Sequence, residues 1–168
     1  MCVASASFSC ASIPGLTSPV ERDYVLRLIA TVAAAIARIR RRRGSGDFAG
    51  ARDEVHAASA ELLGTSASLV SVADARTGAD LLGDSRRIAA YGRLMSEDAD
   101  LLHSLGWHDE ARTTARRALA FLVEAYLRAG SLDTDGETAL LSLRAQVLSS
   151  VLEPRYSNAL QARRDKVD

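Results

Sequence analysis

The chain has 168 residues, of which 48% are hydrophobic and 25% charged, a composition typical of globular proteins that form a core without disulfides or metals. Its 21 basic and 21 acidic residues give a formal charge of zero, which excludes the long-range attraction typical of nucleic-acid and membrane-surface proteins. Three histidines and two cysteines offer few metal ligands, so we expect neither a metal nor another cofactor.

Residues 1–19 carry no charge and are rich in serine and other small residues, so we expect a flexible N-terminal tail. The basic start and unbroken apolar run of a signal peptide are missing, because Arg22 is the first basic residue and serines interrupt each apolar stretch. No segment approaches the roughly 20 consecutive apolar residues that cross a membrane. We therefore expect a cytoplasmic protein that does not associate with membranes.

A long helix is expected from about Glu21 to Arg43, because apolar residues recur there at the spacing of one helix face. These residues are Val25, Leu28, Ile29, Val32, Ile36 and Ile39. Acidic residues begin this helix and arginines end it, as the helix dipole favours. Gly44 starts the break that follows.

A second helix is expected from Asp47, its N-cap, to Leu63, with Gly64 as its stop. Its expected buried residues are Phe48, Ala51, Val55, Ala58 and Leu62. Residues 65–84 are ambiguous, and we expect one or two short helices joined near Gly78.

Residues 85–105 and 109–129 are expected to form two further long helices. Their expected inward residues are Ile88, Tyr91, Met95, Ala99, Leu102 and Leu105, then Ala111, Ala115, Ala118, Leu119, Leu122 and Tyr126. A fifth helix is expected to begin after the stretch Asp133 to Gly136 and to run to about Leu152, with Pro154 as its stop.

No run of the sequence alternates apolar and polar residues with β-branched enrichment, so no sheet is expected. We expect a single all-α helical-hairpin domain over residues 20–154. Residues 155–168 are expected to form a basic tail or a frayed helix.

Two stretches of the chain match each other, Gly46 to Arg52 and Gly106 to Arg112. In both, alanine and then arginine follow five and six residues after the glycine, and a second alanine stands seven residues beyond the first. Glycine lets the chain reverse, and the spaced alanines let two helices approach closely. Each stretch therefore predicts a helical hairpin, whose end is plugged by Phe48 or Trp107.

These turns resemble the helix–turn–helix unit of tetratricopeptide repeats, over residues 24–64 and 86–130. The two turns are 60 residues apart, whereas a regular array would place them about 34 apart. From about Glu21 onward the chain is also similar to small uncharacterised bacterial proteins with one such pair of hairpins. The resemblance implies two antiparallel hairpins with a short helical insertion and a C-terminal capping helix. It also implies an interaction module for a protein or peptide.

Arg38 and residues 40–43 form the densest cluster of charge in the chain. One interpretation is a contact for an anion or nucleic acid, and the other is a solvated helix end. Zero net charge and the lack of a recognition-helix pattern argue against nucleic acid. A partner's carboxylate is a further possibility, so Arg40, Arg41 and Arg43 are candidate partner-binding residues.

Asp100 and His103 stand at i, i+3 on one expected helix, a spacing at which such residues bind metals in helical bundles. A bundle site needs a second motif of this kind, and His56 with Asp53 does not complete one. An alternative function, a small helical-bundle enzyme or metal carrier, would use Asp100 and His103.

Trp107 and His108 lie in the second turn and are candidate partner-binding residues, because Trp107 is the only tryptophan. Acidic pairs such as Glu97 and Asp98 are expected to be solvated on polar faces. No serine lies in a Gly-x-Ser-x-Gly elbow, and no glycine loop is suited to phosphate, so we assign no catalytic residue and expect no enzyme.

The sequence favours a non-catalytic protein-interaction or scaffold module whose partner is unknown. Arginine-mediated binding of a nucleic acid or regulator is a second alternative to it. Long helices rich in alanine also favour self-association, so we expect a homodimer. Leu26 and Leu127, which lie off the main apolar faces, are its candidate contact residues.

Overall fold

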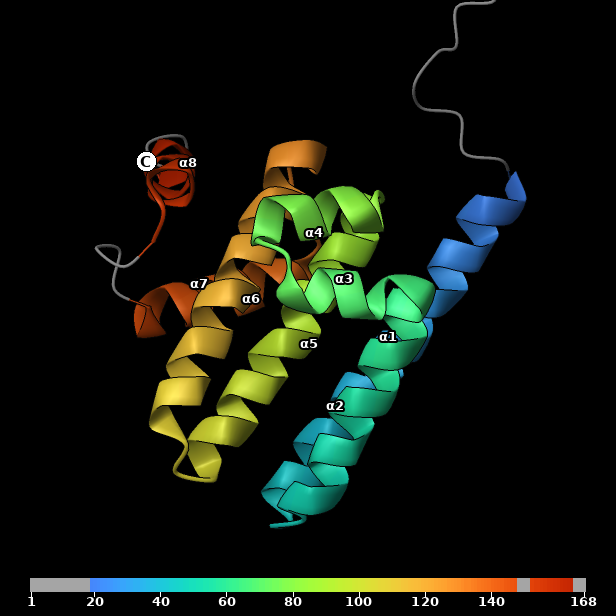
Figure 1. Cartoon of the computed structure of the whole chain (residues 1–168), viewed down its shortest axis with the longest axis vertical. Helices are drawn as coiled ribbons and strands as arrows, with labels where there is room; N and C mark the ends of the chain where they lie inside the picture. Colours follow the sequence, from blue (N-terminus) through green and yellow to red (C-terminus); the bar gives the residue numbers. More distant parts are fainter. Residues whose placement is uncertain (1–18, 148–151, 165–168) are drawn as a thin grey trace, which may run out of the picture.

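The computed structural model describes residues 19–147 and 152–164, and every regular element in these ranges is helical (Figure 1). The elements are α1 (Pro19–Gly44), α2 (Phe48–Leu63), the 3-10 turn η1 (Gly64–Ser66), α3 (Ala67–Val72), α4 (Ala75–Leu82), α5 (Ser85–Ser104), α6 (His108–Ala129), α7 (Thr134–Gln146) and α8 (Pro154–Arg164). The expected all-α fold class is confirmed. The expected tail lies outside the described residues, except for Pro19, which begins α1.

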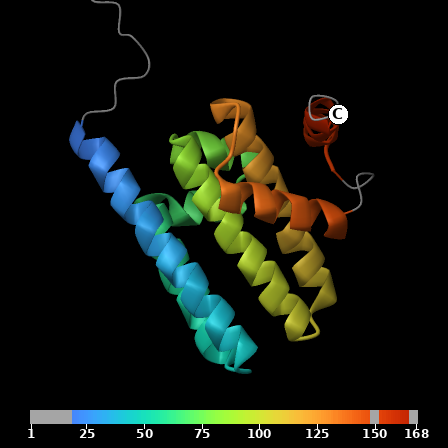
Figure 2. The same ribbon diagram turned by 180° about the vertical axis from the view of Figure 1, so that it is seen from behind.

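Two pairs of helices form the body of the molecule. α1 lies along α2, and α5 lies along α6, each pair joined by a short turn (Figures 1 and 2). α5 also contacts α1 and α2, so the two pairs pack on each other through α5. The insertion α3–α4 follows α2 and rests on the second pair through α4, while α7 contacts α5 and α6.

The alanines that the repeat predicts at helix contacts are all buried. Each is at most 5% exposed: Ala51, Ala58, Ala111 and Ala118. The turn glycines Gly46 and Gly106 have φ of +79° and +80°, a conformation that other residues rarely adopt. The prediction that these alanines are buried is confirmed.

The central helix α6 is buried on every side over two turns. Residues 118–125 are all buried, because α4, α5, α7 and α8 each contact α6. Phe121 is fully buried, and its ring meets that of Tyr91 edge-on at a centroid distance of 4.9 Å. The single apolar face that the sequence predicts for this helix therefore describes only part of its buried surface.

The close approach of α5 to α6 depends on Gly92. A Cβ added there would lie 2.8 Å from Cγ of Leu122 and 3.2 Å from the backbone oxygen of Ala118. Ala118 of the repeat therefore faces Gly92 on α5. The sequence pattern does not predict this role of Gly92.

Gly78 does not join two helices, contrary to the sequence prediction. It lies within α4, where an added Cβ would be 2.8 Å from the ring of Phe121. The break falls instead at Ala73 and Asp74. Asp74 caps α4 by accepting a hydrogen bond of 3.0 Å from the backbone N–H of Thr77.

The fifth long helix ends earlier than expected. α7 stops at Gln146, after which Val147 has an extended backbone (φ −101°, ψ 118°) and a side chain buried in the core. The predicted extent to Leu152 is therefore wrong. Pro154, expected to be a stop, is the first residue of α8, where its missing N–H costs no hydrogen bond.

Glu124 of α6 anchors α8, the helix formed by residues that the sequence assigns mostly to a tail or frayed helix. Its side chain is 0% exposed and accepts hydrogen bonds from Nε of Arg155 at 2.8 Å and from Arg128. Arg128 also contacts Asp80 of α4 at 2.5 Å. Burial raises the pKa of Glu124, but the hydrogen bonds from Arg155 and Arg128 outweigh it and hold this pKa below its usual value.

We expect Gly92→Leu to lower the free energy of unfolding by about 1–3 kcal/mol, because the new side chain would overlap Leu122 in a close-packed core. Gly44→Leu is the matched control, since nothing lies within 4 Å of a Cβ added at Gly44. Urea unfolding followed by circular dichroism measures both variants. Equal stabilities would contradict the close approach at Gly92.

We expect Glu124→Gln to speed hydrogen exchange of residues 154–164 at neutral pH, with a loss of about 1–3 kcal/mol in the free energy of opening. Glu110→Gln, at an exposed position of the same helix, is the control and should change nothing. The lowered pKa means that the stabilisation is complete above about pH 4.3, the usual glutamate value, and is lost as the pH falls through the lower pKa of the folded state. The difference between the variant and the wild type should therefore narrow in acid, and a difference independent of pH would argue against the ion pair.

Candidate functional site

Most arginines at the end of α1 bind carboxylates of the same chain. Nε of Arg38 donates to Glu54 of α2 at 2.9 Å. Nη1 of Arg42 donates at 2.7 Å to Asp47, the N-cap of α2. These two ion pairs fasten α1 to α2 and neutralise part of the cluster.

Arg40 and Arg43 bind a buried carboxylate on α5. Glu97 is only 4% exposed; Nη2 of Arg40 lies 2.6 Å from its Oε1, and Nη1 of Arg43 lies 3.5 Å from its Oε2. The hydrogen bond to Glu97 raises the pKa of Arg40. The expectation that Glu97 is solvated is wrong, because packing of α1 on α5 encloses it. Arg40 and Arg43, two candidate partner-binding residues, are therefore already paired with a carboxylate of their own chain.

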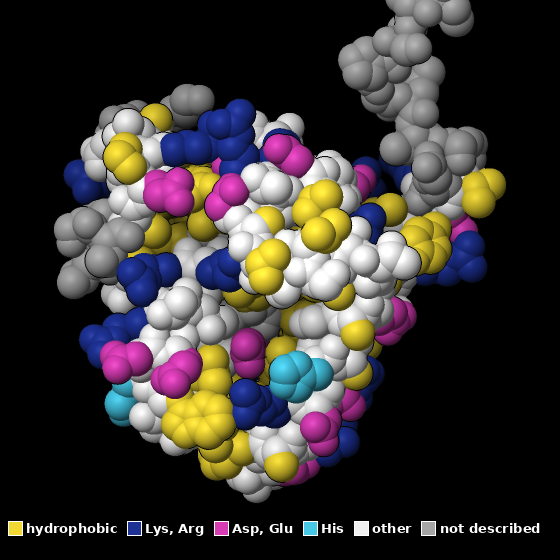
Figure 3. All heavy atoms as spheres, viewed as in Figure 1, with side chains coloured by type: hydrophobic (Ala, Val, Ile, Leu, Met, Phe, Trp, Pro, Cys, Tyr) yellow, Lys and Arg dark blue, Asp and Glu magenta, His cyan; other side chains and the backbone are white. Residues whose placement is uncertain are grey.

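Arg41 is the one candidate of this cluster that stays open. Its side chain is exposed and has no carboxylate partner among the described residues. On the face shown in Figure 3, basic and acidic side chains are interspersed rather than gathered by sign. This face of the molecule therefore shows no continuous basic surface of the kind that nucleic-acid binding needs.

Asp100 and His103 face different partners. Asp100 lies 3.2 Å from Nη1 of Arg43, which occupies its carboxylate. Nδ1 of His103 lies 3.3 Å from Nδ1 of His108, close enough for one ring to donate a hydrogen bond to the other. Within residues 19–147 and 152–164, no group of three or more His, Cys, Asp or Glu is placed to hold a metal.

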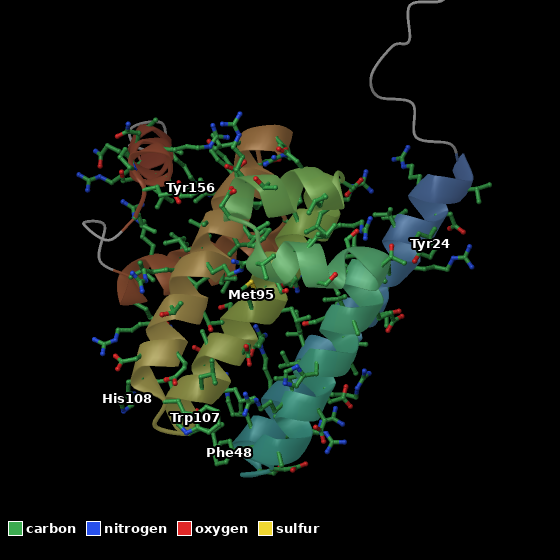
Figure 4. All side chains as sticks on the ribbon, in the orientation of Figure 1. Tyr24, Phe48, Met95, Trp107, His108 and Tyr156 are labelled. Atoms are coloured by element: carbon green, nitrogen blue, oxygen red, sulfur yellow. The ribbon has the colours of Figure 1, made fainter. Side chains whose placement is uncertain are left out.

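Trp107 is 43% exposed and links the second turn to α2. The guanidinium of Arg52 lies 4.8 Å from the centre of its ring, a cation–π contact. Figure 4 places Trp107 and Phe48 at the same end of the molecule, and Phe48 packs against the core. Trp107 therefore contacts Arg52 of α2, and part of its ring stays exposed to solvent.

Asp98 has surroundings that the sequence does not predict. It lies on α5 near His56 and Arg52 of α2, and burial raises its pKa despite these two basic neighbours. In the described part of the chain, the carboxylate of Asp98 makes no hydrogen bond or ion pair. The expectation that Asp98 is solvated on a polar face is therefore only partly met, because its side chain is half-buried.

An apolar pocket of about 260 Å³ opens between the first half of α1, the first half of α5 and the turn from α6 to α7. Its apolar lining consists of Leu26, Ile29, Ala89, Ala90, Ala129 and Leu132. From the side shown in Figure 2, α1 diverges from the body where these three elements meet. The sequence predicts each of these elements but not that they meet at a pocket. Leu26 is the one lining residue that the sequence marks as a candidate contact, and it does so for a homodimer.

Two arginines border this pocket, and only one of them, Arg93, forms ion pairs in the described part of the chain. Arg93 is fixed by Asp135 at 2.5 Å and Asp133 at 3.5 Å, which secures the start of α7 beside α5. Arg86 is exposed, and its side chain has no ion pair in the described ranges. The pocket therefore combines an apolar interior with one guanidinium that is open to an anionic group.

Comparisons with known proteins do not identify a family for this chain. No protein-family model, no curated protein and no solved structure matches the chain. Among the helices of the described residues, none is both long and apolar enough to cross a lipid bilayer.

Proposed function

We propose that the protein is a non-catalytic interaction module built on two tetratricopeptide-like hairpins. Its partner places an apolar side chain in the pocket between α1, α5 and the α6–α7 turn. The observation that carries this proposal is the pocket itself, with its apolar lining and the unpaired Arg86 at its border.

The size of the pocket supports a protein partner. Its volume of about 260 Å³ is below the roughly 300–1,000 Å³ of sites for small molecules and suits one or two apolar side chains. Arg86 would then pair with an acidic residue beside that anchor. A short peptide segment with one apolar and one acidic side chain fits this combination.

The lining of the pocket argues against catalysis there. Ser85 and Ser131 are its hydroxyl groups, and neither a histidine nor a cysteine stands with them in the lining. The lining carboxylate, Asp133, accepts hydrogen bonds from Gly136 and Arg93 and so has a structural role.

The alternatives expected from the sequence have weaker support. A metal carrier would need Asp100, whose carboxylate binds Arg43. A nucleic-acid partner would need the arginines of α1, most of which bind Glu54, Asp47 and Glu97. We also propose, from the sequence, that the protein is bacterial and works in the cytoplasm.

Affinity capture from cells of the source organism, read by mass spectrometry, tests the proposed pocket. Ala89→Glu adds a charge to the lining, whereas Ala60→Glu makes the same change on the exposed side of α2. We expect Ala89→Glu to lose a partner that the wild type and Ala60→Glu retain, because the larger charged side chain occupies the apolar lining and can pair with Arg86 three residues away. Circular dichroism checks that both variants fold.

Arg86→Ala gives a second measurement with the captured partner. We expect its dissociation constant to rise about threefold to tenfold at low salt, and this increase to shrink at high salt, because the contact is ionic. Equal capture by Ala89→Glu and Ala60→Glu would refute the pocket as the partner site.

A further inference from the structure

The outer face of α1 is uncovered. α1 has 26 residues and α2 has 16, so the first turns of α1 extend past the end of α2 (Figure 1). α1 forms one edge of the molecule, with no helix on its outer side (Figure 2). Leu26 on this helix is 46% exposed.

Four apolar residues mark the outer face of α1: Leu26, Ala30, Ala33 and Ala37. They follow one another in steps of four, three and four residues, the spacing that lines up one side of a helix against a partner helix. Ala30 and Ala37 are exposed, and Ala33 is half-buried. Small side chains at three of the four positions allow a second helix to approach closely.

This face is complementary to itself in an antiparallel arrangement. A two-fold axis beside residues 31 and 32 would set Leu26 opposite Ala37 of a second copy, and Ala30 opposite Ala33. A large side chain then meets a small one at each end of the contact. The same two contacts repeat in both directions, as a symmetric dimer requires.

Charge supports the same arrangement. Asp23 and Arg41 flank the apolar residues on the same side of α1, and the symmetry brings Asp23 of one copy to Arg41 of the other. Asp23 is 63% exposed and pairs only with the neighbouring Arg27 of its own helix, while Arg41 has no carboxylate partner in the described part of the chain. The helix dipoles oppose each other, and a net charge of zero adds no long-range repulsion between copies.

We propose that the protein forms a homodimer in which α1 packs antiparallel against α1 of a second copy, with Leu26, Ala30, Ala33 and Ala37 as the contact and Asp23 paired with Arg41. The dimer proposal does not rest on the pocket, because the other contact residues, Asp23, Ala30, Ala33, Ala37 and Arg41, do not line it. Leu127, the other contact residue expected from the sequence, is exposed on α6 and plays no part in it.

Sedimentation equilibrium of the full chain from about 1 to about 300 µM tests the dimer, since a contact between two single helices is small for a specific interface. We expect a monomer–dimer equilibrium for the wild type. Ala30→Arg should give a folded monomer, because two guanidinium groups would meet beside the axis. Ala60→Arg, the same change at an exposed position of α2, should leave the equilibrium unchanged.

Charge reversal tests the register. Asp23→Arg and Arg41→Glu should each raise the dissociation constant of the dimer about tenfold, because each places like charges together twice. The double variant Asp23→Arg/Arg41→Glu restores opposite charges and should recover most of the wild-type affinity.

A monomer at every concentration, a dimer insensitive to Ala30→Arg, or a double variant no tighter than the single ones would overturn the proposal. None of these results affects capture of a partner through the pocket, which Ala89→Glu tests separately. Failure of the dimer and failure of the pocket are therefore distinguishable.

Discussion

The fold depends on the close contact between α5 and α6. Gly92 removes a side chain where Leu122 and the backbone of Ala118 approach, and this lets the two helices bury their facing sides without a gap. The remaining helices then add to a core that already exists, since α1, α2 and α4 contact α5, and α4, α7 and α8 contact α6. A loss of this contact would affect the interfaces that α1, α2, α4, α7 and α8 form with this central pair.

Two buried carboxylates on this central pair receive the outer helices. Glu97 of α5 binds Arg40 and Arg43 of α1, and Glu124 of α6 binds Arg155 of α8. Buried ion pairs contribute little net stability, because desolvation opposes their attraction. Their effect here is to fix where α1 and α8 sit, since a shifted helix would leave a carboxylate buried without a partner.

The sequence predicted what depends on neighbours along the chain. The apolar spacing of Val32, Ile36 and Ile39, the cap at Asp47 and the alanines of the repeat all report local geometry, and the structure confirms them. Glu97 and Glu124 were beyond this reasoning, because a carboxylate within a helix has the same local pattern whether it meets water or an arginine from a distant helix. The prediction that Gly78 joins two helices was wrong for a related reason. Glycine is needed there because the ring of Phe121, on the distant helix α6, packs against it.

The proposed pocket and the proposed dimer contact share one element, α1. One side of α1 packs on α2 and α5, another borders the pocket, and the third carries the proposed dimer contact. Leu26 stands between the last two sides. Arg40 and Arg43 of α1 bind Glu97 of α5 and so fix the position of α1. The pocket and the dimer contact therefore both depend on Glu97, although Glu97 is buried and lies in neither of them.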